Sequence, residues 1–229
     1  SRIEIDTRFG VPTYGENDRY LLDGEALVPA AAHAGAPTCT GAVRFRPRVE
    51  GAFSYILRCG ASVTDYHWEI RDRTGTKFFY GQTDASRLAS YAAIPGPIFA
   101  WHLDRVEDTN GNVTTFGYAP DAGSGGGGGG EPWKQIYPER IDYTSHTSGT
   151  VAAYRVEFVL DDGTRPDQII TGRPAFKVLT RRLLRAVRVL FGTQPVRTYV
   201  LEYAHGQFGK SLLKSVRVPG RRISFCSRS

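Results

Sequence analysis

The residues of this sequence that most resemble a metal-ligand set are Asp108, Asn110 and Asn112, which alternate as calcium ligands do in Asp-x-Asp-x-Asp loops. A complete calcium loop of the EF-hand type has a glutamate at its twelfth position, where this chain has Ala119. The same residues also suit the turn of a β-hairpin, because Asn-Gly favours tight turns. We therefore expect a hairpin turn here, and we assign no residue as a metal ligand.

Two histidines and two carboxylates are candidates for acid–base catalysis: His67, His102, Glu69 and Asp104. A hydrolase would be indicated by a nucleophile or metal motif such as GxSxG or HExxH, and the sequence contains neither. Glycosidase chemistry would require the two carboxylates to lie about 5–10 Å apart, and nothing in the sequence brings them together. We expect solvent-facing or half-buried histidines, no catalytic or cofactor-binding residue, no cofactor and no enzymatic activity.

Aromatic residues and glycines suggest two further kinds of binding site. Trp68, Tyr80 and Trp101 could form a platform on which a sugar stacks, although aromatic strand residues more often belong to a core or to cross-strand pairs. The glycine run at 125–130 lacks the Lys-Ser/Thr pair and the strand–helix context of a phosphate-binding loop. We expect a flexible glycine-rich loop at 123–130.

The elements that must position these residues are successive aromatic-rich hairpins. Residues 101–118 alternate between apolar and polar side chains on both sides of Asn110-Gly111, which predicts two antiparallel strands closed by a tight turn with positive φ at both residues. Residues 66–72 and 77–81 form a similar unit around Thr74-Gly75. Further strands are expected at 19–29 (a hairpin about Asp23-Gly24), 43–49, 53–59, 140–143, 151–160 and 196–203.

Two segments leave alternatives open. Pro47 cannot donate a hydrogen bond to a sheet, so its strand is expected at a sheet edge or at a bulge. Residues 176–190 have apolar residues at helical spacing among several arginines, which fits a basic amphipathic helix that binds membranes or acidic partners. The β-branched Val187 and Val189 and the clean strand that follows favour a bent strand instead, and we expect the strand.

Composition limits the class of protein. The 229 residues are 41% hydrophobic and 23% charged, with abundant tyrosine and phenylalanine and no methionine, which is typical of a globular, strand-rich chain. The net charge of +6 permits nucleic-acid binding, but no recognised motif accompanies it, so we expect no nucleic acid as a partner. No apolar run approaches the roughly 20 residues of a membrane span. Cys39 and Cys59 can pair if their strands are neighbours, which would leave Cys226 free.

An ordered series of short segments resembles the SpvB-like amino-terminal domain, which is shared by a plasmid virulence protein and the B components of insecticidal Tc toxin complexes. No single segment is specific, but the ordered set is, and it runs through most of the chain. The segments are YLLDGEALV (20–28), FRPRVEG (45–51), YHWEI (66–70), WHL (101–103), DTNGN (108–112), YPERIDYT (137–144), VEF (156–158), RPD (165–167), RLL (182–184), YVLEY (199–203) and SLLKSV (211–216).

The resemblance implies an all-β chain of successive antiparallel hairpins, forming a large curved sheet or part of a β-shell related to Rhs/YD-repeat shells. It implies one SpvB-like domain over 1–229 that acts as a non-enzymatic scaffold in a secreted toxin and helps to enclose or present a toxic polypeptide. Its partners would be the remaining domains of the toxin B/C shell and that polypeptide. The alternative is a carbohydrate- or cell-surface-binding β module that uses exposed aromatic residues.

The two ends of the chain give rise to further expectations. The family's opening strands would lie before Ser1, and the tail at 221–229 does not resemble the family's continuation, so we expect a fragment whose tail differs from that of the family. A strand that has lost its neighbour presents unpaired backbone groups. We therefore expect self-association through free strand edges near Phe9 and Tyr203.

Overall fold

Alternating apolar and polar residues form strands in nearly every part of the chain that the structure describes. The structure is a computed structural model that describes residues 1–31, 39–51, 53–91, 95–124, 130–163 and 165–218, and the backbone of 221–224. Two short 3₁₀ turns accompany the strands, η1 (Asp84–Ser86) and η2 (Gln207–Gly209). Among the described residues, no helix has the length and apolar character needed to cross a membrane. The expected all-β architecture is confirmed.

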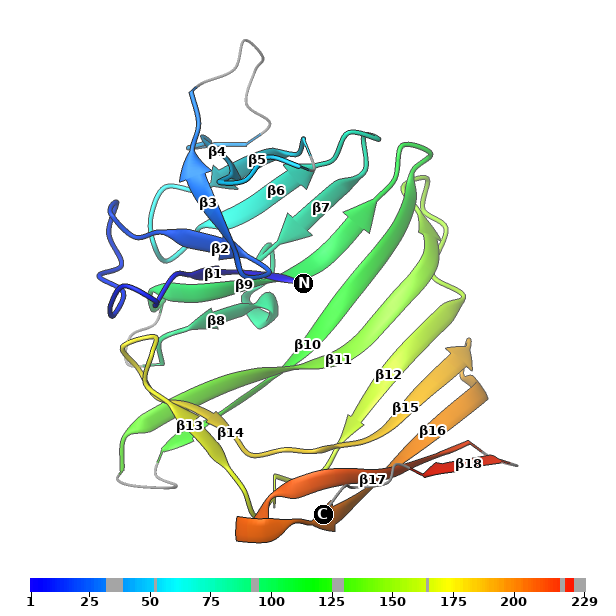
Figure 1. Cartoon of the computed structure of the whole chain (residues 1–229). Helices are drawn as coiled ribbons and strands as arrows, with labels where there is room; N and C mark the ends of the chain where they lie inside the picture. Colours follow the sequence, from blue (N-terminus) through cyan, green and yellow to red (C-terminus); the bar gives the residue numbers. More distant parts are fainter. Residues whose placement is uncertain are drawn as a thin grey trace.

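The first part of the sheet closes on itself. Its strands are β1 (Arg2–Ile5), β2 (Tyr20–Leu22), β3 (Glu25–Pro29), β4 (Val43–Pro47), β5 (Tyr55–Cys59), β6 (His67–Arg71), β7 (Lys77–Tyr80), β8 (Arg87–Ala89) and β9 (Ile98–Glu107). Each of β1 to β6 pairs antiparallel with the next strand, both β1 and β7 pair with β9, and β8 pairs with β9 beside this path. These strands form the ring at the upper left of Figure 1.

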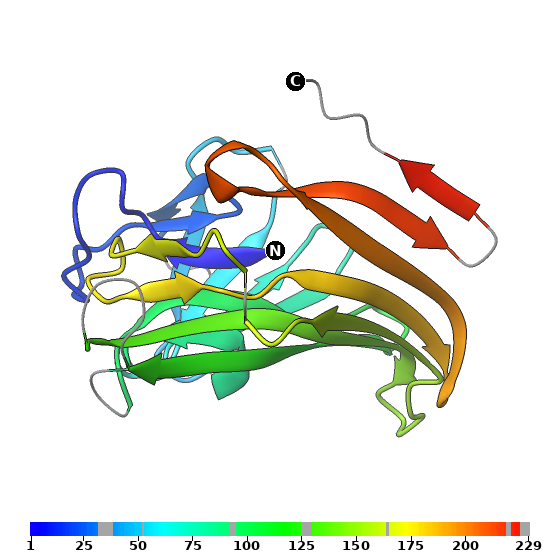
Figure 2. The ribbon, with the colours of Figure 1, turned by 90° about the horizontal axis from the view of Figure 1, so that it is seen from below.

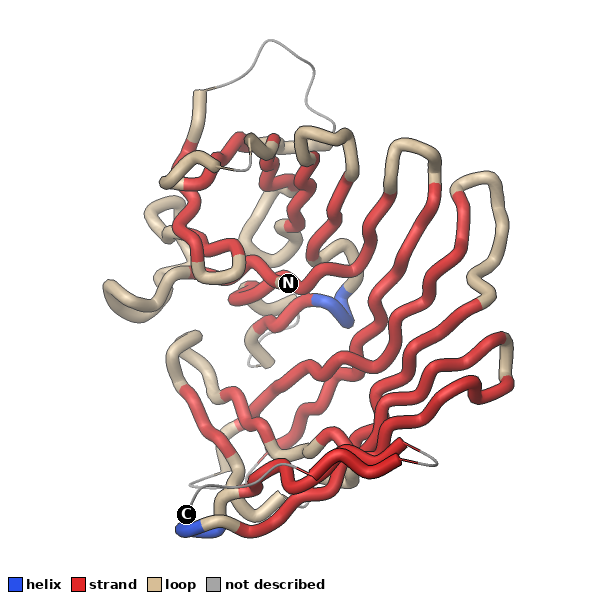
Figure 3. Tube along the Cα trace, turned by 45° about the vertical axis from the view of Figure 1, so that its right-hand side comes forward, coloured by secondary structure: helices blue, strands red, loops and turns tan. Residues whose placement is uncertain are grey.

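Beyond β9 the sheet continues as a single curved layer. Its strands are β10 (Asn112–Ser124), β11 (Pro132–His146), β12 (Tyr154–Leu160), β15 (Leu184–Phe191), β16 (Gln194–His205), β17 (Ser211–Val218) and β18 (Arg221–Ser224). β13 (Ile169–Thr171) and β14 (Val178–Thr180) form a separate two-stranded sheet. Figures 1 and 2 show the layer curling from β10 to β17 into a barrel-like shape, and Figure 3 shows how little of the chain is helical.

The core of the ring is aromatic. Trp68 and Trp101 are 0% and 1% exposed, and their ring centroids lie 5.9 Å apart in an edge-to-face arrangement. Tyr20 packs against both indoles at 4.9 and 5.9 Å. Such edge-to-face pairs place the positive edge of one ring on the negative face of another. Tyr80 is also buried, so the three residues proposed as a sugar platform belong to the core, and the platform is wrong.

A three-residue loop closes the central hairpin. The N–H of Gly111 donates to the carbonyl of Asp108 at 3.1 Å, and the N–H of Asp108 donates to the carbonyl of Asn112 at 3.1 Å. Gly111 has φ +84°, whereas Asn110 does not adopt a positive φ, so the predicted hairpin is confirmed but its two-residue turn is wrong. The reason is that Asp108 Oδ1 accepts the N–H groups of Asn110 and Asn112 at 2.8 and 2.9 Å, which stabilises the wider loop.

The same loop chemistry recurs along one rim of the sheet. In the β6–β7 hairpin, Asp72 Oδ1 accepts the N–H groups of Thr74 and Thr76 at 2.8 and 3.0 Å, and Gly75 has φ +90°. The Asp108 carboxylate therefore has the role of a turn residue. Asp108 and Asp72 each accept hydrogen bonds from backbone N–H groups of their own hairpin loops. This arrangement agrees with the prediction of a hairpin turn at Asp108.

Two other local predictions are confirmed, and one is wrong. The hairpin about Asp23-Gly24 forms, with φ +48° and +90°. Residues 176–190 are extended in β14 and β15, with a break at 181–183. Pro47, in contrast, ends an interior strand: β4 pairs with β3 at Pro47 and with β5 only at Val43 to Phe45. Pro47 is tolerated because the β4–β5 pairing has already stopped before it.

The predicted free edges are also wrong. Phe9 lies in a loop after β1, which is paired on both sides by β2 and β9. Tyr203 lies in β16, an interior strand that pairs with β15 from Gln194 to Val200 and with β17 from Val200 to His205. In the described chain the last strand of the curved layer is β18, which pairs with β17 alone.

The glycine-rich run and the tail fall largely outside the described residues. β10 and β11 pair directly across the run, from Ser124 opposite Pro132 onward, so the strands on either side share one sheet. Residues 125–129, on which the predicted flexible loop depends, lie outside the described residues, as do 225–229 of the tail.

Candidate functional site

A buried carboxyl group of the ring lies where β9 meets η1. Asp104 is 6% exposed, and its Oδ2 accepts hydrogen bonds from the N–H groups of Gln82 and Thr83 and from the hydroxyl of Ser86, at 2.6, 3.1 and 2.8 Å. Its Oδ1 is buried and has no hydrogen-bond partner in the described part of the chain. Burial raises the pKa of Asp104 above its usual value. The carboxyl anchors η1 to β9.

His102 lies on the same strand but is not arranged as a catalytic base. Burial, together with the positive charge of Arg2, lowers its pKa to about 4. Its ring packs against Tyr118 at 5.3 Å, and its Nδ1 is buried with no partner among the described residues. In a Ser-His-Asp site the histidine takes the proton of the serine hydroxyl, whereas here Ser86 bonds the Asp104 carboxylate directly. Ser86 is also 0% exposed, so a substrate cannot reach it.

A cleft of about 350 Å³ lies beside Asp104, and the two arginines that line it are already paired. Arg105 forms an ion pair with Glu107, and Arg140 forms ion pairs with Glu139 at 2.6 Å and Asp142 at 3.2 Å. Because the two arginines of the cleft are neutralised by their own neighbours, the cleft offers no strong charge to a ligand.

The other predicted pair, His67 and Glu69, lies on β6 beside a disulfide. Cys39 and Cys59 are bonded, with their Cα atoms 5.7 Å apart, which resolves the pairing that the sequence left open. The Glu69 carboxylate lies within 4.8 Å of both sulfur atoms. This grouping is not a metal site, since disulfide sulfurs are not thiolates. Glu69 therefore lies beside the disulfide, whereas Asp104 lies beside η1, so the two carboxylates have different surroundings.

Two charged assemblies have no counterpart in the sequence analysis. The first joins β10 to the break between β14 and β15: the buried carboxylate of Asp121 accepts two hydrogen bonds from Arg181, at 2.7 and 2.9 Å, and Arg182 adds a longer pair. The paired arginines at 181–182 were visible in the sequence as a basic cluster, but their partner is 60 residues away.

The second assembly is a pocket of about 400 Å³ beside β3, which we call the arginine pocket. Three arginines and one aspartate supply its charges. Its lining residues are Asp6, Arg8, Phe9, Arg19, Ala26, Leu27, Val28, Pro29 and Arg48. The sequence carries no signal for it, because its residues come from β3 and from the loops after β1 and β4.

The comparison with protein families decides the class of the chain. The family described as SpvB, Salmonella virulence plasmid 65kDa B protein, matches residues 1–168. The chain belongs to the SpvB family. This match confirms the resemblance that the ordered sequence segments indicated. A search of curated protein sequences found no match.

Solved structures share the fold of this SpvB-family chain. The N-terminal domain of effector protein SpvB from Salmonella typhimurium strain LT2 has a TM-score of 0.77 at 20% identity, and the match covers 98% of this chain and 86% of that one. The TcdB2-TccC3-Cdc42 structure has a TM-score of 0.75 at 19% identity over 97% of this chain. The Photorhabdus luminescens Tc holotoxin pore gives the same values. In both Tc structures the matched part is 13% of the longer chain.

Proposed function

We propose that this SpvB-family chain is a non-enzymatic structural domain of a secreted toxin, which helps to build a β-shell that encloses or presents a toxic polypeptide. The whole described sheet would act as one SpvB-like domain. Its partners would be the other domains of the shell and the enclosed polypeptide.

The observation that carries this proposal is the half-buried state of the curved layer. Ala186 is the only buried residue of β12, β15 and β16, whereas strands of the ring such as β5 bury most of their residues. Apolar side chains on this layer remain exposed, among them Phe191 (53%), Tyr154 (37%) and Val200 (37%). A sheet normally buries at least one face against another layer, so this layer suits a protein in which something else covers it.

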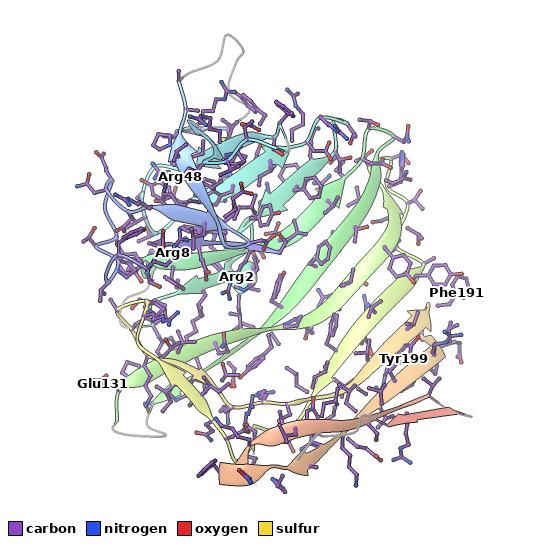
Figure 4. All side chains as sticks on the ribbon, in the orientation of Figure 1. Arg2, Arg8, Arg48, Glu131, Phe191 and Tyr199 are labelled. Atoms are coloured by element: carbon purple, nitrogen blue, oxygen red, sulfur yellow. A yellow bond between two sulfur atoms is a disulfide. The ribbon has the colours of Figure 1, made fainter. Side chains whose placement is uncertain are left out.

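The pairing register identifies which residues would meet an enclosed polypeptide. Phe116 packs against the ring core, and it stands opposite Ile141, which stands opposite Val156. Directly opposed residues share one face of a sheet. Val189 stands opposite Val156 and therefore lies on the same face. Val187 lies two residues before Val189, also on this face, and stands opposite Tyr199. We call this the inner face; Arg188, opposite Glu157, lies on the outer face. Figure 4 labels Tyr199 on this layer and Phe191 at its rim.

Two other features support the proposal. The Cys39–Cys59 bond is typical of proteins that mature in an oxidising compartment, which fits secretion. The polar groups at Asp104 and Ser86 are engaged in anchoring η1, which fits a structural role for them. The carbohydrate-binding alternative loses Trp68, Tyr80 and Trp101, because all three are buried.

Site-specific photocrosslinking tests the proposal in the natural full-length protein, produced together with its toxic polypeptide. A photoreactive phenylalanine analogue replaces Tyr199 on the inner face or Arg188 on the outer face. We expect crosslinks to the polypeptide from position 199 and few from position 188. Equal crosslinking from both positions, or none from position 199, would contradict enclosure against the inner face.

A further inference from the structure

The arginine pocket holds more positive charge than the described chain neutralises. Arg8 binds Asp6 through two hydrogen bonds, Nε to Oδ1 at 2.9 Å and Nη2 to Oδ2 at 2.8 Å. The Asp6 side chain is 1% exposed and is the only acidic residue of the lining. Among the described residues, Arg19 and Arg48 form no ion pair. Three guanidinium groups thus face one carboxylate, which leaves the pocket with an excess of positive charge.

An exposed aromatic ring stands among these charges. The side chain of Phe9 is 72% exposed, and the guanidinium carbons of Arg19 and Arg8 lie 4.9 and 5.9 Å from its ring centroid. Arginines held at this distance over a ring gain cation–π attraction and help to fix the ring. The pocket therefore presents an apolar surface directly beside its unpaired cations.

Backbone hydrogen bonds hold the pocket on the rigid ring. The N–H of Asp6 donates to the carbonyl of Arg19 at 2.8 Å, and the N–H of Arg48 donates to the carbonyl of Ala26 at 2.7 Å. Leu27, at 4% exposure, forms part of the apolar floor. Figure 4 shows Arg8 and Arg48 on the same, left-hand side of the molecule. The volume of about 400 Å³ falls within the roughly 300–1,000 Å³ of small-ligand pockets.

We propose that the arginine pocket binds an organic anion, a carboxylate or phosphate group attached to a flat apolar body. Arg19 and Arg48 would bind the anion, because guanidinium groups match carboxylate and phosphate oxygens in charge and geometry. Phe9 would pack against the apolar body. The anion is either a free small molecule or the side chain of a partner protein, and these sources share the same chemistry.

Titration calorimetry on the folded chain, with three probes, tests this inference. The probes are inorganic phosphate, phenyl phosphate, and a peptide that carries one phosphotyrosine among neutral residues. We expect phenyl phosphate to bind about tenfold more tightly than inorganic phosphate, and Arg48→Gln to weaken phenyl phosphate binding by about tenfold, the loss of one charge-assisted hydrogen bond. Phe9→Ala should remove most of the preference for phenyl phosphate over inorganic phosphate.

Controls keep the result specific to the pocket. Arg173→Gln removes an arginine from a different pocket and should leave the affinity unchanged, and melting curves verify that each variant folds. A peptide that binds at least as tightly as phenyl phosphate indicates a partner protein, and a weaker peptide indicates a free ligand. No binding of phenyl phosphate, or equal losses in Arg48→Gln and Arg173→Gln, would overturn the inference. The pocket and the inner face have no residue in common, so either proposal can fail without the other.

Discussion

Gly81 lies so close to the indole of Trp101 that a side chain at position 81 would overlap the indole ring. Gly81 follows β7 directly, has φ +68°, and donates its N–H to the carbonyl of His102 at 3.0 Å. Trp101 is 1% exposed, and its Nε1 donates a hydrogen bond to the carbonyl of Tyr66. The indole is therefore held on both sides, and the chain can leave β7 only through a residue without a Cβ.

Gly81→Ala should destabilise the ring strongly. The substitution places alanine at a positive φ and forces a methyl group into the packed indole, and together these effects should cost roughly 2–4 kcal/mol. Chemical denaturation measures the loss. Gly172→Ala is the matched control, because its Cβ meets nothing within 4 Å, and it should change the free energy of unfolding by less than about 0.5 kcal/mol. Equal stabilities would show that the indole moves aside freely.

Asp121→Asn should loosen the junction between β10 and the break at 181–183. Asp121 is 5% exposed, and the variant would leave Arg181 and Arg182 without their shared counter-charge. We expect a loss of roughly 2–3 kcal/mol, below the value for a fully buried pair because both arginines remain partly exposed. Thermal unfolding measures it. Asp84→Asn, which removes a fully exposed carboxylate from an ion pair, should have almost no effect.

The Cys39–Cys59 bond should stabilise the folded chain by about 3 kcal/mol. The bond closes a loop with a sequence separation of 20 residues, and a cross-link of this span restricts the unfolded chain accordingly. The double variant Cys39→Ser/Cys59→Ser should therefore melt at a lower temperature than the parent. A reducing agent should lower the melting temperature of the parent but leave that of the variant unchanged. A reductant effect of similar size in the variant would mean that another bond is responsible.

His102 should make the folded chain less stable in mild acid. The pKa of His102 is lowered by burial to about 4 from an ordinary value near 6.5, so the unfolded chain binds its proton more readily than the folded chain. Above pH 6.5 His102 is neutral in both states and does not lower the free energy of unfolding. As the pH falls toward 4, the free energy of unfolding decreases by up to about 3 kcal/mol. His102→Phe, which keeps a ring against Tyr118, should flatten the free energy of unfolding between pH 6.5 and 4.

His205→Gln serves as the control for this pH dependence, since His205 is exposed. Asp104 has the opposite effect on the free energy of unfolding. Its pKa is raised in the folded chain, so the folded chain binds this proton more readily and gains stability as the pH falls. The comparison of parent and His102→Phe isolates the histidine, as Asp104 is present in both. An unchanged slope in His102→Phe would contradict the assignment.

The short-range features of this protein were readable from its sequence. Asp23-Gly24 and Asp72 to Gly75 specify their turns through φ preferences and side-chain to backbone hydrogen bonds, which act within five residues. The β-branched residues at 187 and 189 likewise favoured the extended backbone that β15 adopts. The ordered segments were sufficient to indicate the SpvB family, because each reflects a strand or turn that the shared fold requires.

Beyond the hairpins, only the tertiary structure decided which strands meet. Alternation along a strand tells which side chains share a face, but not which strand lies beside it. β1 pairs with β9, about a hundred residues further along the chain, with Ile3 opposite Trp101. This pairing closes the ring and buries Trp101, which was predicted to stack on a sugar. It also gives β1 a second neighbour, so the predicted free edge near Phe9 is absent from β1. The arginine pocket and the pairing of Asp121 with Arg181 likewise depend on which segments lie together. The pocket joins β3 to the loops after β1 and β4, and Asp121 lies 60 residues before Arg181, so only the folded sheet brings their charges together.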